Sequence, residues 1–156
     1  YPVQFVRQEF RRDSAGSGEF RGGTGINYEV MIGEEAEYSF RGEGLIHPSG
    51  YGTNGGTIGE PGRMTLTFDD SAQIEAPQYG VETYAPLQLH ALSPGGGGWG
   101  NPFKRDAKHV LRDTLDGVVS PEAAETVYGV ALSSDRREID LDKTNRLRDV
   151  NTTTDA

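Results

Sequence analysis

The stretch Ser93-Pro94-Gly95-Gly96-Gly97-Gly98-Trp99-Gly100-Asn101-Pro102 divides the chain into two parts of different character. It contains five of the 22 glycines and the one tryptophan of the sequence. Four successive glycines do not suit the interior of a helix or a strand, because glycine loses the most backbone freedom on ordering. Such a run is expected where the backbone turns sharply or approaches another group closely.

The part before this stretch alternates apolar and polar residues, which is typical of strands with one buried face. Strands are predicted over residues 3–11, 26–32, 37–41, 63–68 and 84–92. Residues 42–62 carry eight glycines and two prolines and are predicted to form a long irregular loop. A loop of this length inside a compact domain is often functional or covered by a partner.

The part after the stretch has the period of α-helices. Apolar residues recur at helical spacing over residues 107–118, where Asp106 is a suitable N-cap and Gly117 a suitable stop. Ser120-Pro121 is predicted to begin a second helix, because proline is favoured at the first helical position. Residues 139–150 have the pattern of a third helix.

The predicted fold class is therefore α+β. Its body is mostly antiparallel and β-rich, either a sandwich or an open barrel, and spans residues 1–103. Two or three short helices in residues 104–150 follow as a cap of the same domain. Residues 151–156 are predicted to be a disordered tail.

Composition restricts the classes of partner. The net charge is −9, from 24 acidic and 15 basic residues. We expect no nucleic-acid partner, because neutralising phosphates needs a basic face, and no attachment to an anionic membrane. The sequence has no cysteine and no apolar run of transmembrane length, so disulfides and thiolate metal sites are excluded and a cytoplasmic location is expected.

The glycine stretch itself is not a known phosphate-binding motif. It lacks the Gly-Lys-Ser/Thr ending of a Walker A loop and the spacing of a dinucleotide fingerprint. A nest of backbone N–H groups around a phosphate stays open as an interpretation. A turn that joins the β-part to the helices is the favoured alternative, because turns are where glycine is commonest.

Few side chains are candidates for catalysis or metal binding. His47, His90 and His109 have none of the short spacings of local metal sites. His47 lies in the long loop and is the functional candidate among them, because loops carry function disproportionately; an inert loop histidine is the alternative. Asp69-Asp70 follows a predicted strand and is interpreted as a turn rather than as a metal-binding pair.

Four groups of motifs follow one another along the chain. They are Tyr1-Pro2-Val3 with residues 10–23 (Phe-Arg-Arg-Asp-Ser-x-Gly-x-Gly-x-Phe-Arg-Gly-Gly); Arg41 and Pro48-Ser49-Gly50 with residues 55–62 (Gly-Gly-x-x-Gly-x-Pro-Gly); residues 94–102 of the glycine stretch; and Arg105-Asp106, Val110 and Asp113 with residues 117–124 (Gly-Val-Val-Ser-Pro-Glu-Ala-Ala) and Tyr128-Gly129-Val130. In this order and spacing, over about residues 1–132, they resemble the C-terminal part of the hydantoinase B / 5-oxoprolinase family.

The resemblance implies a place in a larger enzyme. B-type chains of this family are several times longer, so the chain is expected to be a C-terminal domain. Family enzymes couple ATP cleavage to opening a cyclic amide, such as a hydantoin or 5-oxoproline, or to carboxylating a ketone, such as acetone or acetophenone. The expected partners are an A-type ATPase subunit or domain and the upstream part of the chain's own B-type polypeptide. ATP and a divalent metal are expected in the full enzyme, with no cofactor bound by this chain.

The resemblance gives no catalytic residue in this segment. The candidates for lining a substrate site are therefore the residues of the two glycine-rich segments, namely His47, Gly55, Gly56, Gly96, Gly97 and Trp99. Three hypotheses stay open. The chain belongs to a cyclic-amide hydrolase, belongs to a ketone carboxylase, or is an assembly module without site residues.

Overall fold

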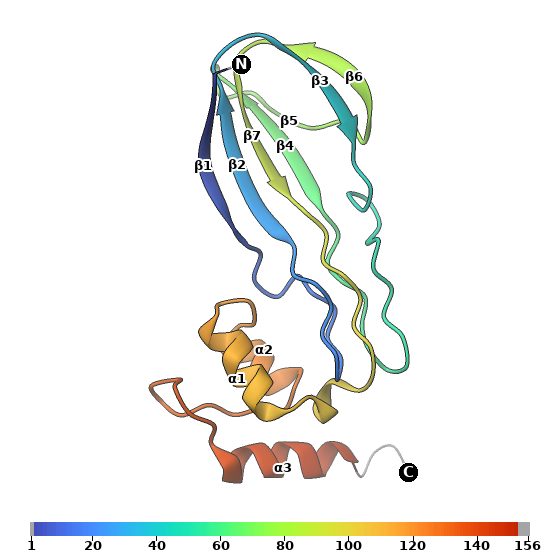
Figure 1. The fold of residues 1–156 in the computed structure, drawn as a ribbon, viewed down its shortest axis with the longest axis vertical. Coiled ribbons are helices and arrows are strands. Elements are labelled where there is room, and N and C mark those ends of the chain that lie inside the picture. Colours follow the sequence, from blue (N-terminus) through green and yellow to red (C-terminus); the bar gives the residue numbers. More distant parts are fainter. Residues whose placement is uncertain (1, 153–156) are drawn as a thin grey trace.

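Seven β-strands form the first part of the fold in a computed structural model that describes residues 2–152, with side chains up to residue 149 (Figure 1). Five of them make one antiparallel sheet in the order β1-β2-β7-β4-β5. Their bounds are Val3–Phe10 (β1), Ile26–Ile32 (β2), Leu87–Leu92 (β7), Arg63–Phe68 (β4) and Gln73–Glu75 (β5). The other two, β3 (Ala36–Arg41) and β6 (Tyr79–Tyr84), pair antiparallel in a separate two-stranded sheet.

The two sheets share an apolar core. Val30 of β2 and Leu66 of β4 both lie opposite Leu89 of β7, so their side chains point to one face of the larger sheet. Phe40 of β3 is 6% exposed and belongs to the same core, as does Leu87. The prediction of an antiparallel, β-rich body is confirmed, and the body is an open sandwich rather than a closed barrel.

Two local predictions for the body have different outcomes. The segment predicted as one strand over residues 84–92 is divided between β6 and β7, with Ala85-Pro86 between them. Proline has no N–H to give to a strand ladder, which accounts for the break. The turn at Asp69-Asp70 is confirmed, because the Asp70 carboxylate accepts a hydrogen bond from the Ala72 N–H at 2.9 Å.

The second part of the chain is helical, as predicted. A short 3₁₀-helix (η1, Pro102–Lys104) precedes α1 (Ala107–Leu115), α2 (Pro121–Thr126) and α3 (Leu141–Thr152). The Asp106 carboxylate accepts from the Lys108 N–H at the start of α1, and Ser120 Oγ accepts from the Ala123 N–H at the start of α2. Gly117 has a φ of +76°, as a residue that ends a helix requires. α3 runs two residues into the segment predicted to be a tail, and residues 153–156 lie outside the described residues.

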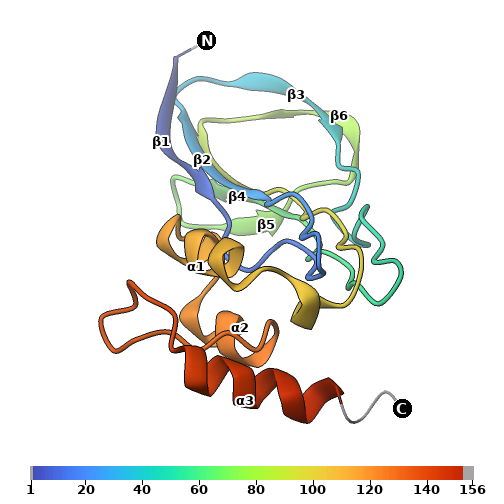
Figure 2. The same cartoon turned by 60° about the horizontal axis from the view of Figure 1, so that its bottom comes forward.

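A second apolar core holds these helices together. Its buried members are Val110, Val118, Val119, Ala124, Tyr128 and Val130. This core shares no residue with the sheet core, and the glycine-rich segments lie between the two (Figures 1 and 2). No helix among residues 2–152 is long and apolar enough to cross a membrane.

Candidate functional site

Three glycine-rich segments, far apart in the sequence, lie side by side between the two cores. They are residues 13–25, 50–62 and 93–101, which we call the glycine bundle. The first and third segments are joined by N–H···O=C bonds from Gly16 to Gly96 (2.8 Å) and from Gly96 to Gly23 (2.8 Å). The second joins both, because Thr57 donates to Ser17 (2.8 Å) and Gly98 donates to Thr57 (2.9 Å).

The glycine run is extended and serves close approach rather than a turn. None of the four residues 95–98 has a positive φ. A Cβ on Gly97 would overlap the carbonyl oxygen of Tyr51, and a Cβ on Gly98 would overlap that of Ser17. Any larger residue would therefore push neighbouring backbones apart and break the hydrogen bonds between them. The run still joins the β-part to the helices, but the neighbours that it approaches are the chain's own backbone.

The far end of the bundle carries an exposed aromatic pair. Phe20 and Trp99 form an antiparallel bridge with N–H···O bonds in both directions, at 3.0 and 2.9 Å. Their rings lie 5.5 Å apart between centroids, and the two residues are 61% and 46% exposed. Thr53 forms a parallel bridge to Trp99 on its other side. The Trp99 backbone is thus fixed by two neighbours while its ring faces solvent.

The structure brings together five of the six predicted site residues. Gly55, Gly56, Gly96, Gly97 and Trp99 all belong to the glycine bundle, where Gly56 packs against Gly98 and Gly55 lies beside Asn101. His47 is exposed and lies on the segment between β3 and the bundle. Because most of these glycines face backbone, Trp99 is the member whose side chain is open to a ligand or partner. Their role in lining a substrate site stays a prediction.

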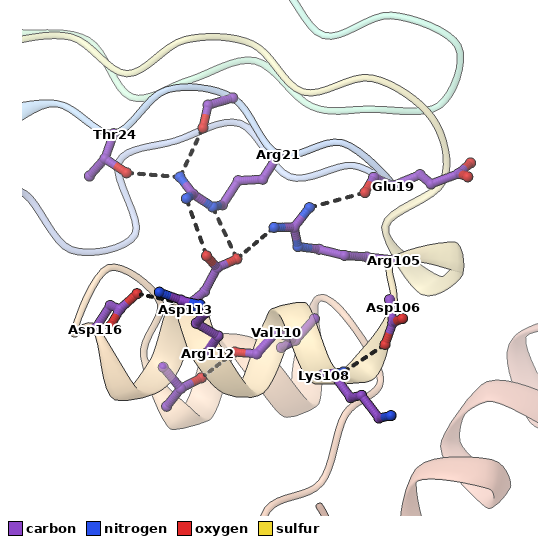
Figure 3. Close-up of polar contacts among 12 residues, drawn as sticks. Glu19, Arg21, Thr24, Arg105, Asp106, Lys108, Val110, Arg112, Asp113 and Asp116 are labelled. Carbon is purple, nitrogen blue, oxygen red and sulfur yellow. Dashed lines mark hydrogen bonds and ion pairs between the residues drawn. The ribbon is translucent and has the colours of Figure 1, made fainter.

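A buried ion-pair cluster joins the bundle to the helices. Asp113 of α1 is 8% exposed and is bound by two arginines from different segments (Figure 3). Arg21 of the bundle donates to it through Nε (3.2 Å) and Nη2 (3.3 Å), and Arg105 donates through Nη2 (2.9 Å). Arg21 also donates to Thr24 Oγ1, and Arg105 to the Glu19 carbonyl. The cluster therefore fixes the second half of the first glycine segment, residues 19–24, against α1.

Sequence reasoning gave this cluster no role, although its residues were among the quoted motifs. The available signal is the position of Asp113, which lies three residues after Val110 and so shares the buried face of α1. A carboxylate on an apolar face needs partners, because an unpaired buried charge is costly. Sequence spacing does not identify those partners, because Arg21 is distant in the chain.

A small cavity lies beside the cluster, between the bundle and α2. Its volume is about 160 Å³, and its lining includes Asp13, Arg21, Glu60 and Tyr128 together with apolar residues of the helical core. Burial raises the pKa of the Tyr128 phenol, against a smaller lowering by the positive charges of Arg105 and Arg21. Burial therefore favours the neutral form of this phenol at the wall of the cavity.

The described residues offer few groups for catalysis. No group of three or more histidine, aspartate or glutamate side chains that could hold a metal ion occurs among residues 2–152. His90 bonds Asn27 at 2.8 Å on the outer face of the sheet, and His109 is exposed on α1. The rings of Phe20 and Trp99 are the exposed aromatic surface that the bundle presents.

A family model described as hydantoinase B/oxoprolinase matches residues 1–102, which is the sheet body together with the whole glycine bundle. The chain belongs to the hydantoinase B/oxoprolinase family. A protein of Pseudomonas sp. (strain NS671) described as the B-type component of a D-/L-hydantoinase is 32% identical over 155 residues, which cover 96% of this chain and 26% of that protein. The acetophenone carboxylase delta subunit of Aromatoleum aromaticum is 38% identical over 84 residues, covering 53% of this chain and 12% of that protein.

The fold is also found in a solved structure of this family. The crystal structure of the ATP-dependent caprolactamase from Pseudomonas jessenii matches with a TM-score of 0.71 and 31% identity, over 95% of this chain and 26% of that one. This hydantoinase B-family chain thus spans about a quarter of the length of the relatives that it matches over nearly its whole length. The family model ends at Pro102, immediately after the bundle, whereas the longer matches include the helices.

Proposed function

We propose that this chain is the C-terminal domain of a B-type subunit of an ATP-dependent enzyme that opens cyclic amides such as hydantoins or 5-oxoproline. In this proposal the domain shapes or completes the active site and the catalytic groups lie elsewhere in the enzyme. The single observation that carries the proposal is the convergence of the family's glycine motifs in one rigid bundle, which ends in the exposed Phe20–Trp99 pair. Membership of the family supports the class of reaction.

The chemistry of the whole enzyme follows from the proposal. ATP would activate the ring carbonyl by phosphorylation, after which water attacks the ring carbon. The ATPase would be an A-type partner subunit or domain, and ATP and a divalent metal would act outside this segment, in the cytoplasm.

The first experiment measures the enzymatic activity of the isolated chain and of the assembled enzyme separately. The 156-residue chain is incubated with ATP and a hydantoin, and phosphate release and ring opening are followed. We expect no turnover from the chain alone, and turnover when an A-type subunit and the rest of a B-type polypeptide are present. Robust ring opening by the isolated chain would overturn the proposal.

A second candidate function is a domain of a ketone carboxylase. It is favoured by the 38% identity to the acetophenone carboxylase delta subunit, the highest identity among the relatives described above. The activation step would be the same, but a carbon nucleophile would replace water. Incubating the assembled enzyme with ATP, bicarbonate and a ketone, and in parallel with ATP and a hydantoin, decides between the two reactions.

Substitutions separate a site-completing domain from an assembly module. Gly97→Val disturbs the bundle, His47→Ala removes the exposed loop side chain, and Gly23→Val is the matched control because a Cβ there meets nothing within 4 Å. A fall in turnover with assembly intact means that these segments complete the site. Weakened assembly with unchanged turnover per complex means that the domain is a module for assembly.

A further inference from the structure

The apolar face of the larger sheet is only partly covered. Val3, Phe5 and Phe10 of β1 lie opposite Ile32, Val30 and Ile26 of β2, so they extend the core face toward the edge of the sheet. These three β1 residues are 45%, 60% and 65% exposed. The sheet core draws its residues from other strands and includes none of β1 among the residues described. We call Val3, Phe5 and Phe10, with the neighbouring Ile26, the open strip.

The open strip is an ordered surface. Phe5 packs edge-on against Tyr28, with 5.6 Å between the ring centroids, which holds its ring on the core face. Phe10 and Ile26 line an open cavity of about 830 Å³, which also has charged residues in its wall (Glu9, Arg11, Arg12 and Asp116), so this end of the strip is uncovered. A sheet face with this pattern is normally covered by another element, because each sheet must bury its apolar side.

Within residues 2–152, no strand pairs with the outer edge of β1. β1 is the first strand in the order β1-β2-β7-β4-β5, all eight of its residues are exposed, and its partner in the sheet is β2. A long edge strand with unpaired N–H and C=O groups is a template for adding another strand. The register shift between Phe5 and Arg7 leaves Val6 outside the alternation, so Gln8 and Phe10 return to the core face.

The residues of β1 on the core face are self-complementary. They are Val3, Phe5, Gln8 and Phe10, as their partners on β2 show. If a second β1 runs antiparallel with full overlap, Val3 lies opposite the second Phe10, and Phe5 lies opposite the second Gln8. This register places no charge on the core face and joins the two open strips into one. Arg7 and Glu9 stay on the other face, where Arg7 already lies 3.6 Å from Glu29.

We propose that a second copy of this chain pairs with the free edge of β1, antiparallel, about a two-fold axis between Val6 and Arg7. The product is a symmetric dimer with one continuous sheet, to which each copy contributes its five strands. Such self-complementary, two-fold interfaces are the commonest kind in soluble homo-oligomers. Each copy carries a net charge of −9, so long-range repulsion opposes the pairing that the apolar strip favours.

This balance gives the dimer a diagnostic salt dependence. The Debye length falls from about 10 Å at about 0.1 M salt to about 3 Å at about 1 M, which screens the repulsion between the two copies. Sedimentation equilibrium of the chain over a range of concentrations should show a monomer–dimer equilibrium that tightens in the higher salt. A chain that stays monomeric throughout overturns the proposal, and the strip would then suit another occupant, such as a different segment of a longer polypeptide.

Charge substitutions locate the interface. Val3→Glu and Phe10→Lys should each weaken the dimer by about tenfold or more, because each buries a charge opposite an apolar side chain. The double substitution should recover much of the affinity, because the two-fold axis brings the opposite charges face to face. Both sites are largely exposed in the single chain, so circular dichroism and thermal unfolding of each variant should match those of the parent.

Ile74→Lys is the matched control, because Ile74 is 41% exposed on β5, the strand at the other edge of the same sheet. It should leave the dimer unchanged. If Ile74→Lys loses the dimer and Phe10→Lys retains it, the dimer forms through the β5 edge rather than the β1 edge, and the proposal is overturned. Failure of the double substitution to recover affinity would overturn the antiparallel register.

Discussion

Arg21 of the glycine bundle and Asp113 of α1 form an ion pair, with 3.2 Å between Nε and Oδ2, in which both side chains are largely buried. This ion pair links the glycine bundle, which has no apolar core of its own, to α1, which belongs to the helical core. Arg105, bound to the same carboxylate at 2.9 Å, lies on the chain that leaves the bundle. One carboxylate and two guanidinium groups therefore hold the bundle on the helices, together with the hydrogen bonds of Asp13 to Val118 and Ser120.

Removing the charge of Asp113 should be strongly destabilising. In Asp113→Asn the two arginines keep their charges but lose their counter-ion, and breaking a buried pair from one side costs about 3–5 kcal/mol. Urea unfolding followed by circular dichroism measures the free energy of unfolding. The control is Asp116→Asn at the C-cap of the same helix. The Asp116 side chain is 61% exposed and pairs with Arg112, so this substitution should change stability by about 0.5 kcal/mol or less. Equal effects of the two substitutions would contradict a structural role for the cluster.

The glycine bundle should discriminate sharply between glycine positions. Gly97→Ala introduces a methyl group against the Tyr51 carbonyl, and forcing backbones apart in a close-packed region costs about 1–3 kcal/mol. Gly23→Ala, at an exposed position where a Cβ meets nothing within 4 Å, should be neutral or stabilising by about 0.4–1 kcal/mol, because it restricts the unfolded chain. Chemical denaturation of the two variants tests the difference. Equal losses in the free energy of unfolding for Gly97→Ala and Gly23→Ala would mean that the glycine run is kept for flexibility rather than for close approach.

The periods of apolar residues predicted the local structure well. Alternation in Ile26–Ile32 and the helical spacing after Asp106 depend on neighbours in the sequence, and both elements form where they were expected. The packing of the glycine bundle could not be predicted from such local patterns. Gly16, Gly56 and Gly98 have no side chain that marks a partner, and their contacts join residues far apart in the chain through backbone atoms alone. Composition identified the glycine segments, but it could not show that they pack against each other.

The candidate site illustrates the same limit. The sequence predicted Gly96, Gly97 and Trp99 together with Gly55 and Gly56 of another glycine-rich segment, and the structure shows that these two segments are in contact. Phe20 was quoted as part of a motif but was not predicted as a site residue. Its contact with Trp99 depends on the antiparallel bridge between two glycine segments, and no local pattern encodes that pairing.

Arg148 should tie α3 to the rest of the helical part. Its guanidinium donates to the carbonyl oxygen of Arg105 at 2.7 Å and to that of Tyr128 at 3.2 Å. Arg148→Met keeps the apolar stem but leaves these partly buried carbonyls without that donor, which should cost about 1–3 kcal/mol. Arg146→Met, at an exposed position on the same helix, is the control and should be nearly neutral. Thermal unfolding and limited proteolysis within α3 report the result, and equal protease sensitivity in both variants would contradict this role of Arg148.

The stability of the helical core should fall at high pH through Tyr128. Burial raises the pKa of its phenol in the folded chain above the ordinary value of 10.0. Below that ordinary value the phenol is neutral in both states, so pH has no effect through this group. Above it the unfolded chain loses the proton while the folded chain retains it, so the unfolded state is favoured as pH rises until the raised folded pKa is passed.

Two other tyrosines contribute to the same effect in the parent protein. Burial also raises the pKa of Tyr38, and the hydrogen bond to Glu43 raises that of Tyr79, so these two groups should also lower the stability of the parent protein at high pH. Melting temperatures measured from about pH 8 to about pH 11 should therefore decline less steeply above about pH 10 in Tyr128→Phe than in the parent. Tyr51→Phe, at a side chain that is 75% exposed, should follow the parent curve, and an unchanged slope in Tyr128→Phe would show that this phenol is not held neutral by the fold.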